Sequence, residues 1–404
     1  MKKLNTSLFL LCLGYLVYDF FYFEKLFKFS ADIWLQLDPP SIPFLQKICF
    51  YISTFGYEAL VIIMVCLCAA DSRRIRSMKI LGLNCLYGAI FIGTKKMFLA
   101  YQRPWWENTA IKTLGCDRDY GRPSGHSEWA VFSYLLIYRE LFVRPHKQHR
   151  PKPEGTSRST ARRIFRDLLI TISLAVMAAR WLLGVHSFDQ VIGGAAWAYI
   201  SFSIYKVLLE DKVDKIFMDI ADGSWRKNLK FYIFLTVALN IITSIIPIVA
   251  YHIAGKSLVG HEAFWKLVFR SRCKDDKHYE GPLELCLYRS TPISLMFGMI
   301  YGLMLLPEKF RHQYLDMHLT TWMKIARMVI MGVLVGIPAS YLAKILTFES
   351  ELIYYRYWFR EVLRLVICGI FLSALCPVCF YYLKLVGTKI EKKLHEEASH
   401  TKTD

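Results

Sequence analysis

The sequence is poor in acidic residues and has neither an internal repeat nor a long linker. It contains 33 Asp and Glu against 51 Lys and Arg, and charged residues of both signs make up only 21% of its 404 residues. The missing repeat excludes solenoid and propeller architectures. The missing linker argues against several tethered domains. We therefore expect one domain in which charge is scarce.

Long apolar runs fill most of the chain. Hydrophobic residues make up 54% of the sequence and aromatic residues 15%. Runs near 20 residues are typical of transmembrane helices, because the bilayer offers no partner for open backbone groups. The sequence predicts an all-α polytopic transmembrane bundle of nine or ten spans. The ten candidate runs are 6–23, 46–70, 79–100, 126–143, 165–185, 189–209, 230–253, 289–307, 322–346 and 361–386.

The net charge of +18 does not indicate a nucleic-acid partner, because the basic residues cluster between apolar runs. The clusters are "DSRRIRSMK" at 71–79 and the segment 144–166. This is the pattern of cytosolic loops in membrane proteins. We expect these segments and the tail 387–404 to face the cytosol. The opposite, luminal side then receives 101–125, the region around 186, 254–288 and 347–360.

The first apolar run lacks the small-residue cleavage site that a signal peptide needs. Aromatic residues stand there instead. A membrane span and an interfacial helix both remain open for this run. Asn5-Thr6-Ser7 is a glycosylation sequon that would be modified only if the N-terminus were luminal.

Most of the eleven cysteines fall within apolar runs, where a buried thiol packs as a small hydrophobe. Cys376 and Cys379 form a CxxC pair without accompanying metal ligands, so no metal site is expected. Cys116, Cys273 and Cys286 fall in predicted luminal loops. One disulfide among them is possible, most simply Cys273–Cys286.

Three polar clusters stand at the predicted luminal helix ends. In the first, "KKMFLAYQRPWW", Lys96 and Arg103 lie near two helical turns apart and can point to one side. A lysine within an apolar run is by default a functional candidate. The alternative is that Lys96 snorkels to the interface and Arg103 is flanking charge.

The second cluster, "PSGH", precedes a predicted helix that starts near His126. A helix N-terminus offers free N–H groups and partial positive charge, which suit a phosphate. Ser124 can cap the helix or donate to an anion, and Gly125 allows close backbone approach. His126 can protonate a leaving group near neutral pH. The alternative is a capped helix with an incidental histidine.

The third cluster, "ARWLLGVHSFDQ", contains Arg180 and His186 between two apolar runs. An arginine in an apolar segment is costly without an anionic partner. Its guanidinium suits two-point contact with phosphate. His186 stands at the start of the next helix, where it could act as a nucleophile.

Together the three clusters resemble the motifs of the type 2 phosphatidic acid phosphatase (PAP2) superfamily. The resemblance implies a metal-free phosphatase without a cofactor. His186 would attack phosphorus and form a phosphohistidine, while His126 would protonate the departing oxygen. The phosphate oxygens would be held by Lys96, Arg103, Ser124, Gly125 and Arg180.

Two positions depart from the superfamily pattern. Ala179 replaces a common serine. Gln190 stands where an aspartate usually orients the nucleophile, with Asp189 one residue earlier. Either side chain could orient His186.

Glucose-6-phosphatases are similar in lacking that aspartate, in carrying "HQ" where this chain has Asp189-Gln190, and in a "QRPWW"-like stretch. Their resemblance covers roughly 46–386 and leaves the first apolar run without a counterpart. It implies a sugar phosphate substrate, as in gluconeogenesis, and a luminal active site in the endoplasmic reticulum membrane. Candidates for lining the substrate cavity are Trp105, Trp106 and Glu107.

Two other functions remain open. "DYGRPSGHS" is also similar to the second motif of long-chain-base phosphate phosphatases, which implies a sphingoid base phosphate or polyprenyl diphosphate as substrate. The second open function is that of a catalytically silent relative that binds or transports phosphorylated ligands. In each case the partners are a phosphorylated ligand and the lipid bilayer. The expected organisation is an N-terminal apolar segment (1–45), a PAP2-like core (46–210), additional transmembrane helices (211–386) and a cytosolic tail (387–404).

Overall fold

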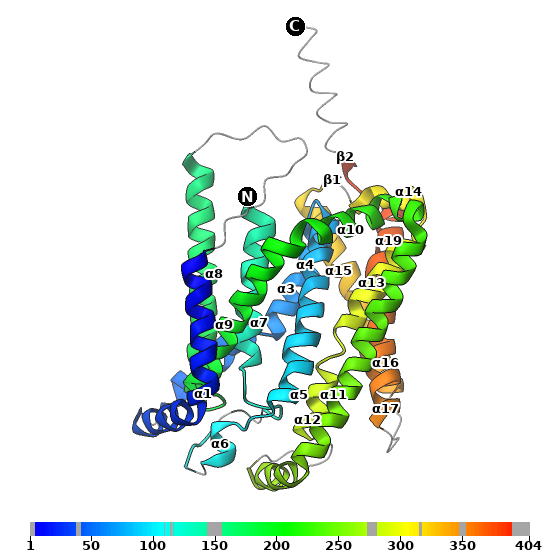
Figure 1. Cartoon of the computed structure of the whole chain (residues 1–404). Helices are drawn as coiled ribbons and strands as arrows, with labels where there is room; N and C mark the ends of the chain where they lie inside the picture. Colours follow the sequence, from blue (N-terminus) through cyan, green and yellow to red (C-terminus); the bar gives the residue numbers. More distant parts are fainter. Residues whose placement is uncertain are drawn as a thin grey trace, which may run out of the picture. The chain divides into compact units, whose positions relative to one another are not determined.

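The computed structural model consists almost entirely of helices (Figure 1). It describes residues 5–37, 42–108, 110–113, 115, 117–143, 156–272, 281–314, 317–346 and 353–389. The strands within these ranges are β1 (Met317–His318) and β2 (Thr388–Lys389), which pair antiparallel. The predicted all-α fold is confirmed. The chain forms two compact units, and the boundary between them crosses several helices.

Unit 1 comprises residues 1–61, 91–210 and 248–287. Within it α7 packs against α8 and α9, α9 packs against α1, and α2 packs against α8 (Figure 1). The elements that lie wholly or largely in this unit are α1 (Thr6–Leu37), α2 (Pro43–Thr54), α5 (Lys95–Leu99), α6 (Pro104–Glu107), α7 (Gly125–Tyr138), η3 (Arg139–Val143), α8 (Thr156–Leu182), α9 (Phe188–Ile204), η4 (Tyr205–Leu209) and α12 (Pro282–Tyr288).

Unit 2 comprises residues 62–90, 211–247 and 288–404. Its core is α13 packed against α4 and α18. The elements wholly or largely in this unit are α4 (Arg74–Tyr87), α10 (Glu210–Asp222), η5 (Ser224–Asn228), α13 (Ile293–Leu305), α14 (Glu308–Arg311), η6 (His312–Tyr314), α15 (Thr321–Met331), η7 (Gly332–Gly336), α16 (Ile337–Ile345), α17 (Ile353–Tyr355), η8 (Arg356–Leu363), α18 (Arg364–Ile370), η9 (Phe371–Leu375) and α19 (Cys376–Tyr382). The boundary passes through α3 (Glu58–Ala70), η2 (Gly88–Thr94) and α11 (Leu229–Arg272).

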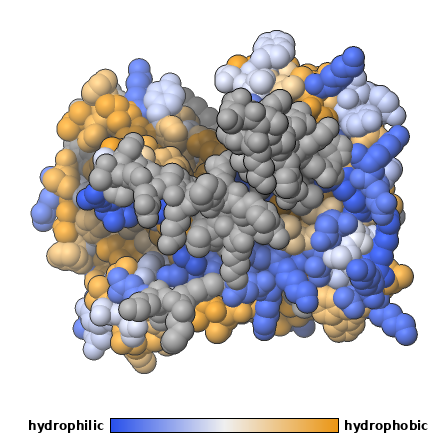
Figure 2. Space-filling model, turned by 90° about the horizontal axis from the view of Figure 1, so that it is seen from above, coloured by the Kyte–Doolittle hydropathy of each residue, from blue (hydrophilic) through white to orange (hydrophobic). Residues whose placement is uncertain are grey.

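Seven helical segments of the described chain are long and apolar enough to cross a membrane. They are Thr6–Leu37, Phe44–Ala70, Arg74–Glu107, Phe188–Asp222, Ser224–Ser257, Thr321–Ile345 and Ile353–Tyr382. The face shown in Figure 2 carries both hydrophilic and hydrophobic residues. The seven apolar helices indicate a multi-pass membrane protein. The remaining predicted spans, 126–143, 165–185 and 289–307, also contain helix but are not among the seven.

The basic segment 71–79 is not the simple loop that we expected. Helix α4 starts at Arg74, and both Arg74 and Lys79 are buried. Lys79 Nζ lies 2.6 Å from Asp214 Oδ1, and Asp71 accepts hydrogen bonds from Arg76 and Ser77. Pairing with Asp214 and Asp71 therefore allows basic residues of this segment to pack within the structure.

The cysteines within the described ranges are of a residue type that can bind metal ions. Among the described residues, no group of three or more His, Cys, Asp or Glu could hold a metal ion. Cys376 and Cys379 lie on α19. Cys116 and Cys273 fall outside the described ranges, so the Cys273–Cys286 disulfide stays a prediction.

Glycines set the close approach of α13 and α18 in unit 2. A Cβ atom at Gly298 would collide with the carbonyl of Val366, and one at Gly369 would collide with the carbonyl of Leu295. Gly302 lies one helical turn beyond Gly298 and is equally crowded by Ser373 Oγ. Small residues spaced in this way let two membrane helices pack backbone to backbone.

Replacing Gly298 by alanine should therefore separate α13 from α18. We expect a loss of about 1–3 kcal/mol, as for other overpacked contacts, seen as a lower thermal midpoint of the detergent-solubilised protein. Gly332→Ala is the matched control, because an added Cβ meets nothing within 4 Å there. Equal midpoints for the two variants would contradict this account of the helix contact.

Candidate active site

All three predicted clusters lie in unit 1, at helix ends. Arg103 precedes Pro104, whose ring suits the first turn of α6. Ser187 is the N-cap residue of α9, and its backbone N–H donates to Gln190 Oε1 at 3.4 Å, next to the turn that carries His186. Gly184 supplies the positive φ of 70° that this turn needs, a conformation that most residues disfavour. The local sequence thus determines how each loop enters its helix.

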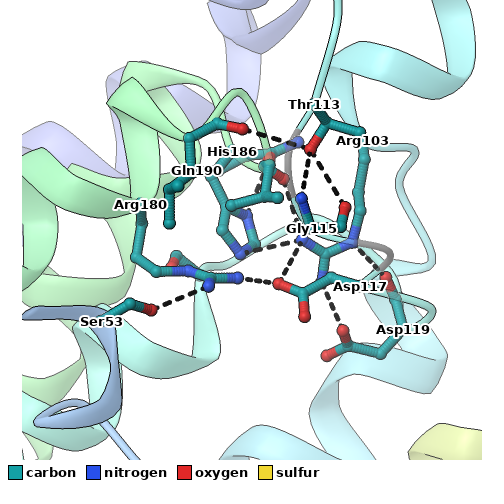
Figure 3. Close-up of polar contacts among 12 residues, drawn as sticks. Ser53, Arg103, Thr113, Gly115, Asp117, Asp119, Arg180, His186 and Gln190 are labelled. Atoms are coloured by element: carbon teal, nitrogen blue, oxygen red, sulfur yellow. Dashed lines mark hydrogen bonds and ion pairs between the residues drawn. The ribbon is translucent and has the colours of Figure 1, made fainter. Parts of the chain in front are cut away.

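Arg103 is the centre of the site (Figure 3). Its Nη1 lies 3.1 Å from His186 Nε2 and donates to the carbonyl of Val185 at 2.8 Å. Both Arg103 and His186 are 1% exposed. The first and third clusters, far apart in sequence, therefore share a buried contact between a fixed cation and an imidazole.

Two aspartates that we did not predict neutralise the cations. Asp119 is fully buried; its Oδ2 lies 2.5 Å from Lys96 Nζ, and it also pairs with Arg103. Asp117 pairs with Arg180 and lies 3.5 Å from Arg103 Nη1. The requirement that cations in an apolar segment have anionic partners could have pointed to "CDRDYG" just before the second motif.

Arg180 comes from the last turn of α8 and points toward the same group. Its Nη1 donates to Ser53 Oγ at 2.9 Å, and its Nη2 pairs with Asp117. Asp117 is 25% exposed at its side chain, whereas Asp119 is 0% exposed. Arg180 and Arg103 thus both contact Asp117, which is the more accessible of the two aspartates.

Gln190, and not Asp189, contacts the imidazole of His186. Gln190 Oε1 lies 3.1 Å from His186 Nδ1, and its Nε2 donates to the carbonyl of Gln102 at 2.8 Å. That second bond fixes which end of the amide faces the histidine. The Oε1 atom accepts only from a protonated Nδ1, so the lone pair lies on Nε2. Neither Asp189 carboxylate oxygen has a hydrogen-bond partner among the described residues.

The second motif is tied to the other two. The backbone N–H of Ser124 donates to the carbonyl of Gln190 at 2.8 Å, and Ser127 Oγ lies 3.1 Å from Ser124 Oγ. An added Cβ at Gly125 would stand 3.1 Å from Ile92 Cγ2 and 3.4 Å from Lys96 Nζ. Gly125 therefore lets the start of α7 pack closely against the segment that carries Ile92 and Lys96.

His126 belongs to the second cluster. It lies in the first turn of α7, is 9% exposed, and has its ring 5.7 Å from that of Tyr57, centroid to centroid. The ring nitrogens of His186 contact Arg103 and Gln190. The structure thus links Lys96, Arg103, Arg180, His186 and the Ser124–Gly125 turn, and His126 directly follows that turn.

A comparison with protein families gives the site a context. Residues 77–214 match the model of the PAP2 superfamily. The matched stretch covers less than half of the chain. The similarity suggests a phosphatase that acts on a phosphorylated substrate. No curated protein and no solved structure matched the chain.

Two of the three candidate cavity residues are buried. Trp105 and Trp106 are 0% and 1% exposed. The ring of Trp106 packs against those of Tyr120 and Trp265. Glu107 is exposed and accepts a hydrogen bond from Gln102 Nε2 at 2.6 Å. The role of these three residues toward substrate stays a prediction.

The surroundings of His186 favour its neutral form. Burial lowers the pKa of His186 well below its ordinary value of 6.5, and the charges of Arg103, Arg180 and Lys96 lower it further. Asp119 opposes this shift. These surroundings thus favour an imidazole with one unprotonated ring nitrogen, the form that attack on phosphorus by His186 would require.

Gln190→Leu should remove the bond to His186 Nδ1 while roughly keeping side-chain size. We expect kcat to fall by at least about tenfold, since a catalytic imidazole needs an orienting partner, with a smaller change in KM. Gln102→Ala is the control, because only the main-chain carbonyl of Gln102 contacts Gln190. Wild-type kcat in Gln190→Leu would show that the contact does not orient the nucleophile.

The pH profile offers a separate check. Because the folded pKa of His186 is depressed, protonation should not remove the nucleophile until the pH falls well below 6.5. The acid limb of kcat/KM, which reports the free enzyme, should lie there. Arg180→Met removes one cation that lowers this pKa, so it should move the limb to higher pH. A limb at about 6.5 in the wild type would contradict the assignment.

Proposed function

We propose that the protein is a metal-independent membrane phosphohydrolase of the glucose-6-phosphatase type. It would cleave a sugar phosphate through a phosphohistidine on His186. The observation that carries the proposal is the placement of His186. Its Nε2 faces Arg103 at 3.1 Å, while Gln190 contacts its Nδ1 at 3.1 Å.

In the first step the Nε2 lone pair of His186 attacks phosphorus. A nitrogen–phosphorus bond forms as the bond from phosphorus to the leaving oxygen breaks, and His126 donates a proton to that oxygen. Gln190 keeps the proton on Nδ1 throughout. Its amide is neutral, so it orients the ring without adding a negative charge beside the incoming phosphate.

In the second step water attacks the phosphohistidine. His126, now neutral, accepts a proton from the water as the new oxygen–phosphorus bond forms. The nitrogen–phosphorus bond breaks, which returns His186 and releases inorganic phosphate. A covalent intermediate divides one difficult displacement into two easier ones.

The cations would stabilise the charge on the transferring phosphoryl group, which is the main demand of this chemistry. Lys96, Arg103 and Arg180 come from three different segments and converge on Asp117 and Asp119. A group of cations that holds carboxylates can hold phosphate oxygens by the same charge-assisted hydrogen bonds. Asp119, more deeply buried, would stay as the fixed counter-charge.

The choice of a sugar phosphate rests on the branch that the sequence resembles. Glucose-6-phosphatases lack the orienting aspartate, and here a glutamine makes the contact with His186. The luminal orientation rests on the basic segments and on the position of the three clusters at the same predicted side. Both assignments follow the resemblance and the charge pattern, and the endoplasmic reticulum membrane is their common expectation.

His186→Ala should abolish phosphate release and covalent labelling. Acid-quenched or denatured samples, made soon after mixing with substrate labelled in its phosphate, should carry label in the wild type only. Gln102→Ala should label normally, because its backbone contact is intact. Turnover at the wild-type rate by His186→Ala would end the phosphohistidine proposal.

A side-by-side assay decides the substrate class. Purified enzyme is given glucose 6-phosphate, sphingosine 1-phosphate and a polyprenyl diphosphate at matched concentrations, and kcat/KM is compared. We expect the sugar phosphate to be preferred. A preference for either lipid by more than about tenfold, or roughly 1.4 kcal/mol in transition-state binding, would replace the sugar-phosphate proposal by a lipid-phosphate one.

A further inference from the structure

Helix α1 has exposed apolar residues, and two polar residues stand among its buried ones. Leu11, Phe20 and Phe21 are exposed. The residues buried along the helix include Asp19 and Ser30, with Phe27 and Trp34 between and beyond them. An aspartate buried in an apolar helix is costly and calls for a functional reason. Its neighbours show that reason.

Asp19 binds the residue that introduces the second motif. Arg122 Nη2 donates to Asp19 Oδ2 at 2.6 Å and to the main-chain carbonyl of Asp19 at 3.1 Å. The guanidinium also lies 4.5 Å from the centre of the Phe23 ring. Arg122 is followed directly by Pro123, Ser124, Gly125 and His126. The ion pair therefore ties α1 to the turn that positions the proposed acid.

Further along, α1 contacts the loop that carries His186. Ser30 Oγ accepts a hydrogen bond from the backbone N–H of Phe188 at 2.8 Å, and so satisfies a free donor in the first turn of α9. Trp34 Nε1 donates to the carbonyl of Leu182 at 3.3 Å. An added Cβ at Gly184 would stand 3.0 Å from the Trp34 ring. The loop from Leu182 to Phe188 is thus held at both ends by α1.

From these contacts we infer that α1 braces the active site: it holds two loops that carry proposed catalytic residues in place. Asp19 and Ser30 are the positioning residues, and each acts on a different loop. Asp19 acts through Arg122 on the loop of His126. Ser30 acts through Phe188 on the loop of His186. This inference rests on the proposed function for its kinetic consequences, but the contacts themselves do not depend on it.

The two positioning residues should have different kinetic signatures. Asp19→Asn disturbs the proposed acid, so it should slow glucose 6-phosphate, whose alkoxide leaving group needs a proton, by about tenfold or more. Nitrophenyl phosphate has a leaving group that departs without a proton, so its loss should be clearly smaller. Ser30→Ala disturbs the nucleophile, so the two substrates should lose rate to a similar extent. A general loss of folded protein would not separate the substrates in this way.

Asp32→Asn is the matched control, because Asp32 is exposed on the same helix. It should keep wild-type rates on both substrates. Asp19→Glu, which retains the charge, should recover part of the rate lost in Asp19→Asn. The inference is overturned if Asp19→Asn matches the wild type, if Asp32→Asn shows the same defect as Asp19→Asn, or if Asp19→Asn slows both substrates equally.

Amide hydrogen exchange tests the structural role of α1 independently of the proposed reaction. Asp19→Asn should speed amide exchange in 120–126, and Ser30→Ala should speed it in 183–190, each leaving the other loop near its wild-type rate. If the wild type turns over neither substrate, the proposed function fails while this measurement still decides the brace. Unchanged exchange in both loops would overturn the brace whatever the activity.

Discussion

The contact between Arg103 and His186 is the constraint on which the rest of the site depends. A permanently charged guanidinium lies 3.1 Å from an imidazole nitrogen in a buried setting. Such an arrangement holds only if the imidazole is neutral and the guanidinium has anionic partners. Asp119 supplies the anion, and Gln190 keeps the proton on the far side of the ring. One contact thereby determines protonation state, ring orientation and local charge.

The site is built from helix ends and the loops that join them. The Ser124 N–H donates to the carbonyl of Gln190, so the loop before α7 is bonded to the first turn of α9. Helix α1 reaches both through Arg122 and Phe188. The proposed phosphoryl transfer needs positioning more than it needs reactive groups. The contacts of α1 with Arg122 and Phe188 are the basis for our inference that this helix serves that need.

The helical class, the three polar clusters and seven of the ten predicted membrane spans could be predicted because each is a local pattern. Periodicity and turn residues act over a few positions, as at Gly184 or the Ser187 N-cap. Asp117 and Asp119 were missed because their role depends on cations that lie 14 to 63 residues away along the chain. Residues 71–79 were expected to form a loop. That expectation was wrong because the sequence does not show that Lys79 pairs with Asp214, which lies far along the chain.

By itself the sequence determined the types of residue at the site, their order and the membrane character of the chain. It left Asp189 and Gln190 as equal candidates to orient His186, because adjacent residues differ in direction only once a helix has a fixed start and a packed face. Tertiary structure decided that choice in favour of Gln190 through its second bond to the carbonyl of Gln102. It also decided that the first apolar run packs against α9, since a helix contacts whichever surface can satisfy its buried polar groups.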